Sequence, residues 1–431
     1  MATPGRRARG ERMTDFELRP IEIHEINAFA SCQAAAFGGR YTPDKLESLA
    51  EELQLDRSLA FFDSGDLVAT TSSYVVPMTL PGLVRCKVAA VTDVSVAPTH
   101  RRRGMLTSMM RRQLDDLRSA NEPLAVLFAS EGGIYGRYGY GPATFGARYV
   151  VDKRPARLLT PVAAPTDSSP GCGSGSVRLV ELDQAAEAFP AVYGAYVPTR
   201  VGELDRPHGE WAELLGNPNG AGEDARHRFY VCYEQAGRIE GYAVYRVAAV
   251  DPADHWRRAV FLEEMCSLGD ESYTSLWRYL LGIDLTEELR TRSRPVDESL
   301  RYLLEDQRHL RMASWGDRTW VRLVDVAQAL ARRRYEEEAI LVIEVEDPFC
   351  PWNDGRFRLS VDRGGVGTVE RVNAAPDLAL PVEALGAVYL GGVPFAGMAE
   401  VGRIAECTEG AARRADRMFS VRRPPFCTTN F

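Results

Sequence analysis

The stretch VTDVSVAPTHRRRGML, residues 91–106, constrains the fold of this chain more than any other short segment. Its alternating apolar residues predict a strand, and Pro98 ends that strand because proline lacks the N–H that a sheet partner needs. Three arginines and Gly104 follow, and the next residues, LTSMMRRQLDDLRSA, have a helical period. The segment therefore predicts a strand that passes into a helix through a short basic loop.

The basic loop has two interpretations. On composition alone, Arg101, Arg102 and Arg103 form a solvated basic turn. Its place before a helix favours an anion site instead, because the first helical turn carries unpaired N–H groups and the positive end of the helix dipole. A pyrophosphate group suits such a site. Nucleic acid is disfavoured as the main partner, since the formal net charge of the chain is -8.

Around this junction the chain has a mixed α/β order. The run from 58 to 78 predicts a hairpin that turns at Asp63–Asp66, and a strand is predicted at 124–130. A second segment repeats the order, with a hairpin at 228–250 turning at Gly237, a strand at 260–268 and a helix at 272–283. We interpret it as a degenerate copy whose strand–helix junction, SLGDES, has no arginine; two unrelated α+β units remain the alternative.

At 431 residues the chain is long enough for two or three domains. A Pro-, Ser- and Gly-rich stretch at 160–176 predicts a linker. A second boundary is expected at 311–317, where a long helical pattern is predicted to end and the alternating run TWVRLVDV begins. A helix at 325–335 and strands at 338–347, 355–364 and 367–374 are then expected. The predicted division is a disordered tail at 1–12, with Met13 a possible start, and domains at 13–160, 161–310 and 311–431.

Other classes of protein are disfavoured. No run of eighteen apolar residues is present, so no membrane span is expected, and the basic N-terminus lacks the apolar core of a secretory signal. Neither zinc nor a disulfide framework is expected, because the eight cysteines include no C-x-x-C pair and the histidines have no ligand spacing. A reducing cytoplasm is the simplest compartment.

Two motifs carry a family resemblance. The run RRRGML resembles motif A of the GNAT acetyltransferases, Q/R-x-x-G-x-G/A, with Leu106 where Gly or Ala is usual. FASEGGIYGRYGYGPATFG, residues 128–146, closely resembles the signature of the Eis (enhanced intracellular survival) family of GNAT enzymes. The resemblance implies an α/β (α+β) fold with a catalytic GNAT domain, a degenerate GNAT-like domain and a sterol-carrier-like domain, whose start WVRLVDVAQALARRRY would fit.

The same resemblance implies acetyl-CoA as co-substrate. In a GNAT fold the strand with Val94 and Val96 and the strand ending at Ser130 splay apart, so that backbone groups of the two valines can pair with the pantetheine arm. Core packing is the alternative for the valine side chains, and the two roles are compatible. The implied coenzyme contacts are Val94, Ser95, Val96, Arg102, Arg103, Gly104, Met105, Leu106, Thr107, Ser130 and Glu131.

Two catalytic groups are implied by the family. Tyr135 matches the general acid that protonates the departing thiolate, whereas Tyr138 and Tyr140 are expected to pack the loop. The base of the family is the C-terminal carboxylate, which here belongs to Phe431, at the end of a third domain whose tail would reach the active site. A frayed terminus is the alternative. An α-carboxyl with a pKa of ~3.5 must be desolvated or act through water to accept the proton of an ammonium group.

Two residues are candidates for substrate binding. Asp93 adjoins the coenzyme strand, although a hydrogen-bonding role at the strand edge is an equal alternative. Asn430 stands where many family members carry a penultimate Glu, so a negative charge near the amine is absent.

The implied activity is direct N-acetylation of aminoglycoside-like polyamines in a ternary complex. A protein lysine N-acetyltransferase is one alternative. Another is a non-catalytic acyl-CoA or lipid carrier, in which the apolar segments EAILVIEV and ALGAVYLGGVPFAGMA of the third domain would line a pocket rather than a core. The family also suggests a homo-hexamer, and we expect no metal, no nucleic-acid partner and no membrane partner.

Overall fold

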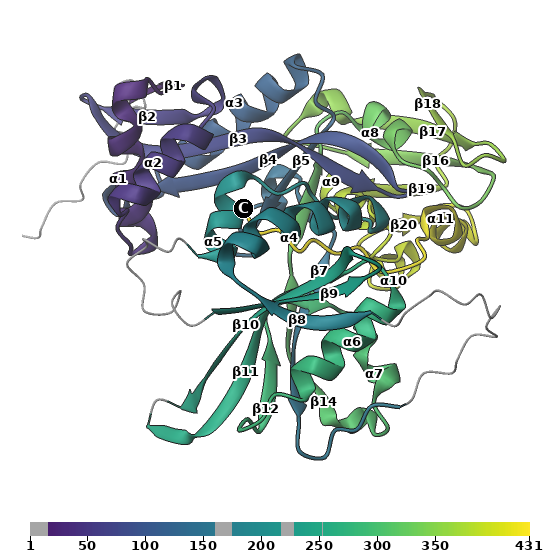
Figure 1. Ribbon diagram of the computed structural model, residues 1–431. Helices are drawn as coiled ribbons and strands as arrows, with labels where there is room; N and C mark the ends of the chain where they lie inside the picture. Colours follow the sequence, from purple (N-terminus) through teal and green to yellow (C-terminus); the bar gives the residue numbers. More distant parts are fainter. Residues whose placement is uncertain (1–15, 160–174, 217–227, 252) are drawn as a thin grey trace, which may run out of the picture. The chain divides into compact units, whose positions relative to one another are not determined.

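The computed structural model describes residues 16–159, 175–216, 228–251 and 253–431 (Figure 1). These residues fall into an N-terminal unit, up to Val75 together with Ala89–Asn121, and a larger unit, Val76–Val88 together with Glu122–Phe431. The tail predicted at 1–12, the possible start at Met13, Cys172 and all but the last two residues of the linker predicted at 160–176 lie outside the described residues.

The N-terminal unit has a sheet in the order β1-β2-β3-β4, in which β2 pairs antiparallel with β1 and with β3. The predicted hairpin is confirmed: β2 and β3 are joined by Ser64 and Gly65, both with positive φ, as a two-residue turn requires. The elements are β1 (Phe16–Pro20), η2 (Ile23–Glu25), α1 (Ile26–Phe37), α2 (Pro43–Glu52), η3 (Leu55–Arg57), β2 (Leu59–Asp63), β3 (Asp66–Leu80), β4 (Val84–Val96), η4 (Pro98–His100) and α3 (Met105–Ser119). The predicted strand–loop–helix junction is therefore present, as β4, η4 and α3.

In the larger unit, β5 (Leu124–Phe128) and β6 (Gly141–Pro142) pair with opposite edges of β15 (Thr319–Leu323). The loop between β5 and β6 contains η5 (Gly136–Tyr138). A second sheet has β8 to β12, β7 and β13, and β14 also pairs with β7. Its strands are β7 (Phe145–Asp152), β8 (Ser176–Val180), β9 (Arg228–Gln235), β10 (Arg238–Asp251), β11 (Asp254–Ser267), β12 (Glu288–Thr291), β13 (Arg294–Pro295) and β14 (Leu310–Asp317).

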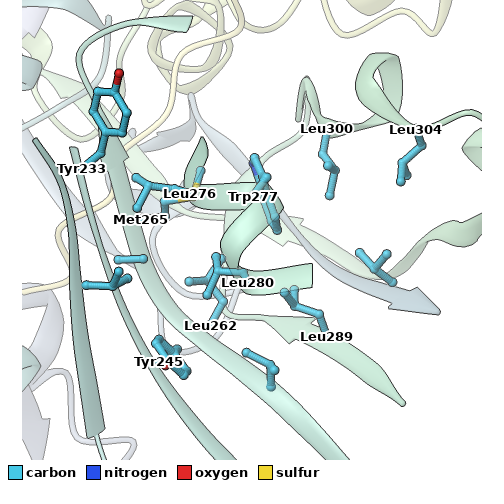
Figure 2. Packing of buried hydrophobic residues seen from close by; sticks show 14 residues of the cluster. Tyr233, Tyr245, Leu262, Met265, Leu276, Trp277, Leu280, Leu289, Leu300 and Leu304 are labelled. Carbon is cyan, nitrogen blue, oxygen red and sulfur yellow. The ribbon is translucent and has the colours of Figure 1, made fainter. Parts of the chain in front are cut away.

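Helices cover both faces of this second sheet. α4 (Leu182–Tyr196) and α5 (His208–Leu215) pack on Tyr230, Tyr242 and Val244, and η6 (Val197–Thr199) follows α4. α6 (Asp270–Leu281) and α7 (Leu300–Leu303) pack on the other face, where Trp277 and Leu280 meet Tyr245, Leu262 and Leu289 (Figure 2). The hairpin and helix predicted for this segment are confirmed.

One sequence expectation for this region is wrong. Instead of a long helix ending near 311–317, the chain forms β12, β13, the one-turn α7, η8 (Gln307–His309) and β14. β14 is a strand because it pairs over its whole length with β7, a partner that no local pattern indicates.

The last part of the chain has a five-stranded sheet in the order β18-β17-β16-β19-β20. Its helix after 325 and its three predicted strands are confirmed. The elements are α8 (Val326–Arg332), β16 (Ala339–Glu346), η9 (Pro351–Asn353), β17 (Gly355–Val361), β18 (Gly367–Arg371), β19 (Leu378–Pro381), α9 (Val382–Val388), α10 (Phe395–Glu400), β20 (Ala405–Glu406) and α11 (Ala411–Phe419).

Two strands join sheets other than those their places in the chain suggest. β7, which begins at the end of the glycine-rich motif at 128–146, lies in the second sheet. β15, which precedes α8, lies between β5 and β6. No helix among the described residues is long and apolar enough to cross a bilayer. The cysteines in the described part of the chain are free thiols, and no cluster of metal-ligating side chains occurs there.

Candidate active site

The basic loop of the N-terminal unit has a strained backbone. Arg102 has φ 65° and Gly104 has φ 85°, both in the left-handed region, which costs a residue with a Cβ about 1–2 kcal/mol. The side chains of Arg101, Arg102 and Arg103 are exposed, and none forms an ion pair with a carboxylate of the described residues. Three guanidinium groups therefore stand on a loop that is held in a tight turn.

The helix that follows presents its amino end to this loop. Gly104 is the N-cap of α3, its carbonyl accepts the first helical hydrogen bond from the N–H of Ser108 at 3.1 Å, and no side chain caps the first turn. An uncapped first turn beside three arginines attracts an anion through both hydrogen bonds and charge. Met105, Leu106 and Thr107, which the resemblance gives as coenzyme contacts, form that turn.

The strand before the loop is held by side-chain hydrogen bonds within the unit. The hydroxyl of Ser95 is buried and lies 2.6 Å from that of Thr70. Val96 packs on an apolar cluster with Met105 and Met109 from α3. The packing of these side chains fits the alternative of core packing, which is compatible with coenzyme binding by the backbone; the role of the strand as a coenzyme-binding edge stays a prediction.

Asp93 lies in a polar cluster of the N-terminal unit. Its carboxylate accepts hydrogen bonds from the Ser72 hydroxyl at 2.5 Å and from the Gln33 amide, and Gln33 in turn accepts from Tyr41. Burial raises the pKa of the Asp93 carboxyl. Its backbone is left-handed, with φ 56°. These contacts fit the alternative in which Asp93 is a hydrogen-bonding group of the strand.

In the larger unit, Tyr135 is buried at the end of the loop that follows β5. Burial, with a smaller contribution from Tyr138, raises the pKa of Tyr135 to about 12, and a hydrogen bond with Ser130 opposes the rise. Ser130 and Glu131 themselves are exposed. The phenol is therefore protonated throughout the physiological range of pH, as a general acid must be before it donates.

The glycines of the signature let the backbone approach other parts of the larger unit. A Cβ on Gly141 would lie 1.9 Å from the carbonyl oxygen of Glu383, on α9. Gly139 has φ 84°, and a Cβ there would meet the buried guanidinium of Arg322 at 2.7 Å. Tyr138 packs on Phe349, with ring centroids 5.1 Å apart. The motif thus joins the loop of Tyr135 to the last domain.

The C-terminal residue lies beside the same short stretch of β5. The ring of Phe431 meets that of Phe128 edge to face, with centroids 4.9 Å apart. Phe128 precedes Ser130 by two residues, and Ser130 is the hydrogen-bond partner of Tyr135. The two predicted catalytic residues, Tyr135 and Phe431, are therefore both anchored to residues 128–130.

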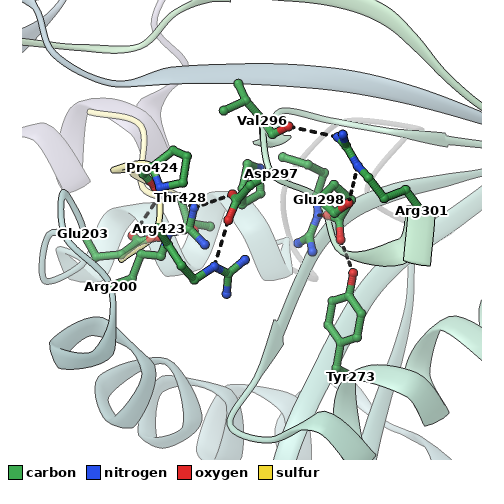
Figure 3. Close-up of polar contacts among 12 residues, drawn as sticks. Arg200, Glu203, Tyr273, Val296, Asp297, Glu298, Arg301, Arg423, Pro424 and Thr428 are labelled. Atoms are coloured by element: carbon green, nitrogen blue, oxygen red, sulfur yellow. Dashed lines mark hydrogen bonds and ion pairs between the residues drawn. The ribbon is translucent and has the colours of Figure 1, made fainter. Parts of the chain in front are cut away.

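The tail that carries Phe431 is held by buried polar groups that sequence reasoning missed. The Glu203 carboxylate accepts from the N–H of Thr428 at 2.9 Å and from its hydroxyl at 2.7 Å (Figure 3). The guanidinium of Arg200 donates to the carbonyl of Pro424, and that of Arg318 donates to the carbonyl of Cys427. Side chains distant in the sequence therefore hold residues 424–428 of the tail.

Glu203 is fully buried, and that burial raises its pKa. The backbone at Glu203 is held by Thr79, whose N–H donates to the Glu203 carbonyl at 2.9 Å. Gly202, with φ 96°, leaves the space that the backbone of Phe426 occupies, since a Cβ would lie 2.8 Å from the Phe426 carbonyl oxygen. No local signal could have identified Glu203 as an anchor of the tail, because Thr428 lies 225 residues away.

Asn430 is exposed and borders a cavity of about 370 Å³. Four carboxylates line this cavity, but five arginines do so as well, and Glu264 forms a buried ion pair with Arg206 at 2.7 Å. The cavity is therefore not the strongly acidic one that an aminoglycoside would favour.

Three family models match along the chain. They describe an acetyltransferase (GNAT) domain over residues 17–143, a second acetyltransferase (GNAT) domain over 202–323 and a sterol carrier protein domain over 326–428. The first two overlap the regions where the sequence predicts a GNAT domain and its degenerate copy, and the third overlaps the predicted sterol-carrier-like domain.

Relatives match most of the chain. An uncharacterised N-acetyltransferase of Streptomyces coelicolor is 42% identical over 93% of this chain and 96% of its own length. The N-acetyltransferase Eis of Mycobacterium tuberculosis is 34% identical over 80% of each chain. The crystal structure of Eis1 from Mycobacterium abscessus has a TM-score of 0.82 and 33% identity, covering 96% of this chain and all of the other.

Proposed function

This chain belongs to the Eis family of GNAT N-acetyltransferases, and on that premise we propose that it transfers an acetyl group from acetyl-CoA directly to an amine of an aminoglycoside-like polyamine. The observation that carries the proposal is the exposed basic loop, which leads into an uncapped helix amino end. In the proposal the phosphates of the coenzyme bind this loop, and Val94 to Val96 supply backbone partners for the pantetheine arm.

In the proposed reaction the neutral amine attacks the thioester carbonyl, a C–N bond forms and the C–S bond breaks. The sulfur leaves with the proton of the Tyr135 hydroxyl, while the proton of the new ammonium group goes to the carboxylate of Phe431. A phenol with a pKa of about 12 gives up its proton to a thiolate at a cost in free energy. A water-poor site reduces this cost, because it raises the pKa of the thiol as well.

The acceptor is the least constrained part of the proposal. Asn430 and the balanced charges of the cavity beside it offer an amine hydrogen bonds rather than a large negative field. A lysine side chain of a protein is therefore the second candidate acceptor. Comparing kcat/KM for a lysine peptide with that for an aminoglycoside would separate the two.

The remaining parts of the proposal come from the family. We propose a homo-hexamer acting in the cytoplasm, where free thiols such as those found here persist. Size measurement in solution by light scattering tests the assembly. A dimer or monomer would contradict it.

Tyr135→Phe is the central test, with Tyr140→Phe as its matched control. The Tyr140 hydroxyl is buried and has no hydrogen-bond partner among the described residues, so its removal should leave the loop intact. We expect Tyr135→Phe to lower turnover about 100-fold or more at unchanged coenzyme affinity, measured by thiol release with a panel of amines and by calorimetry. Equal turnover in the two variants would remove Tyr135 from the role of acid.

A further inference from the structure

The second sheet of the larger unit exposes part of one face. Tyr230, Tyr242 and Val244 on that face are covered by α4 and α5. Further along the same strands the alternation brings Arg228 and Arg246 to this face, beyond the apolar residues that pack against the two helices. A cavity of about 410 Å³ lies there.

Arginines form a row across neighbouring strands of this face. Arg246 on β10 is the register partner of Arg228 on β9 and of Phe261 on β11, and Phe261 is the partner of Arg290 on β12. Register partners share a face, so these side chains lie side by side. Like charges directly opposite each other in a sheet are destabilising, and a bound anion would offset this repulsion.

A bulge supplies the one carboxylate of the cavity. The register of β10 and β11 shifts so that Glu263 has no partner on β10, and a bulge of this kind re-aims a side chain. Glu263 forms ion pairs with Arg246 at 2.9 Å and with Arg292 at 2.5 Å. With Arg148 from β7, five arginines line the cavity against this single carboxylate.

The ion pairs of the described residues do not satisfy all five guanidinium groups. Arg290 pairs at 2.9 Å with Glu288, which does not line the cavity. Among the described residues, Arg228 donates to the backbone carbonyl of Glu213, and neither Arg228 nor Arg148 has a carboxylate within ion-pair distance. The cavity therefore keeps a net positive charge that its own residues do not neutralise.

We infer that this cavity binds a small anion with two or more linked phosphate groups. Planar guanidinium groups bind phosphate oxygens two at a time, and several arginines on one sheet face match a chain of phosphates better than a single charge. The volume is sufficient for a group of this size, and the cation–π contact of Arg246 with Phe261, at 4.4 Å, holds one donor in place. All residues that line the cavity belong to the larger unit, and none of them belongs to the basic loop at 101–104.

Calorimetric titration with tripolyphosphate tests the inference. The full-length protein is first saturated with coenzyme A, so that the basic loop is occupied. Arg148→Gln with Arg228→Gln removes the two arginines that have no carboxylate partner among the described residues, and it leaves both ion pairs of Glu263 intact. The matched control is Arg258→Gln, because Arg258 is exposed on the same strand, β11, at a position of opposite parity to Phe261.

We expect one tripolyphosphate to bind per chain, with affinity at least tenfold weaker in the double variant and unchanged in Arg258→Gln. No binding to the wild type, or equal weakening in the control, would overturn the inference. Thermal unfolding of the three proteins checks that each is folded. Absence of heat in the prior titration with coenzyme A would count against the proposed function alone, because Arg148 and Arg228 do not belong to the basic loop that the proposal gives to the coenzyme.

Discussion

Two junctions in this molecule follow the same plan and differ in charge. In each, the second strand of a long hairpin ends and a helix begins within a few residues: β4 leads to α3, and β11 leads to α6. The first junction carries three arginines and a left-handed Gly104. The second has Gly269 in an extended conformation, with Asp270 and Glu271 in the first helical turn.

The difference shows that the topology alone does not make an anion site. Both helices have the dipole of any helix, but the second already has carboxylates at its positive end, and the Ser272 hydroxyl accepts a hydrogen bond from the N–H of Gly269 at 3.2 Å. A phosphate there would meet two negative charges. In the proposed function, coenzyme binding therefore depends on the loop and not on the GNAT topology alone.

Residues of the second domain have two roles that do not involve its strand–helix junction. Its Glu203 and Arg200 hold the C-terminal tail, and its exposed sheet face carries the arginine row. The second domain would thus contribute to the proposed active site by holding the tail that carries Phe431.

Reversing the charge of the first junction should have the largest effect. Arg102→Glu with Arg103→Glu removes two charge-assisted contacts of roughly 1.5–3 kcal/mol each, so the dissociation constant for coenzyme A should rise on the order of a thousandfold. The control, Asp270→Asn with Glu271→Gln, should leave the dissociation constant within about twofold, since neither residue is a proposed coenzyme contact. Calorimetry at fixed salt measures both dissociation constants. Equal losses of affinity in the two proteins would contradict the distinction between the two junctions.

Releasing the tail should have the next largest effect. Glu203→Ala removes the acceptor of two hydrogen bonds from Thr428, and misplacing a reacting group by an ångström can cost about 100-fold in turnover. Coenzyme affinity should not change. Glu203→Gln keeps a carbonyl oxygen as acceptor and should therefore lose less turnover than Glu203→Ala.

Steady-state turnover and coenzyme calorimetry measure these effects separately. A Glu203→Ala protein with wild-type turnover would show that the tail needs no anchor in the second domain.

Changing the backbone conformation at the two junctions should have a smaller effect on coenzyme affinity. Gly104→Ala places a Cβ on a left-handed residue at a cost of about 1 kcal/mol, so the loop should open and coenzyme affinity should fall about fivefold. Gly269→Ala should have no effect, because its φ is -151° and nothing lies within 4 Å of a Cβ there. Identical affinities in the two variants would mean that the turn at Gly104 is not needed for binding.

The smallest effect concerns pH. Because the pKa of Tyr135 is raised to about 12, turnover should show no loss from this phenol between pH 7 and 10. The raised pKa also stabilises the folded state fully below the unfolded value of about 10, and this stabilisation is lost as pH rises toward 12. Tyr135→Phe should remove that part of the pH dependence of the unfolding free energy.

Tyr233 in the second domain is the tyrosine with which Tyr135 is compared. Burial raises its pKa to about 12 as well, so Tyr233→Phe should change stability above pH 10 in the same direction and leave turnover unchanged. Denaturant unfolding at several pH values measures the first effect, and thiol release measures the second. A fall in wild-type turnover with an apparent pKa near 9, absent from Tyr135→Phe, would contradict the raised value.

Much of the local structure could be predicted because its causes are local. Asp63–Asp66 and Gly237 mark turns that need positive φ, and Pro98 and Gly104 mark the end of a strand and the start of a helix. The region 311–317 could not be predicted, since it is a strand only by virtue of its pairing with β7. The site residues Tyr135 and Phe431 came from the family resemblance, and no pattern in the chain indicated the residues that anchor Phe431.

The sequence by itself determined the hairpins, the basic strand-to-helix junction and the glycine-rich signature, because each depends on the backbone preferences of residues a few positions apart. Only the tertiary structure decided that β7 joins the second sheet and that β15 lies between β5 and β6, that Glu203 binds Thr428, and that five arginines line one cavity. The physical reason is that burial and strand register bring together residues as distant in the chain as Phe128 and Phe431, and their energies depend on that environment rather than on their neighbours in sequence.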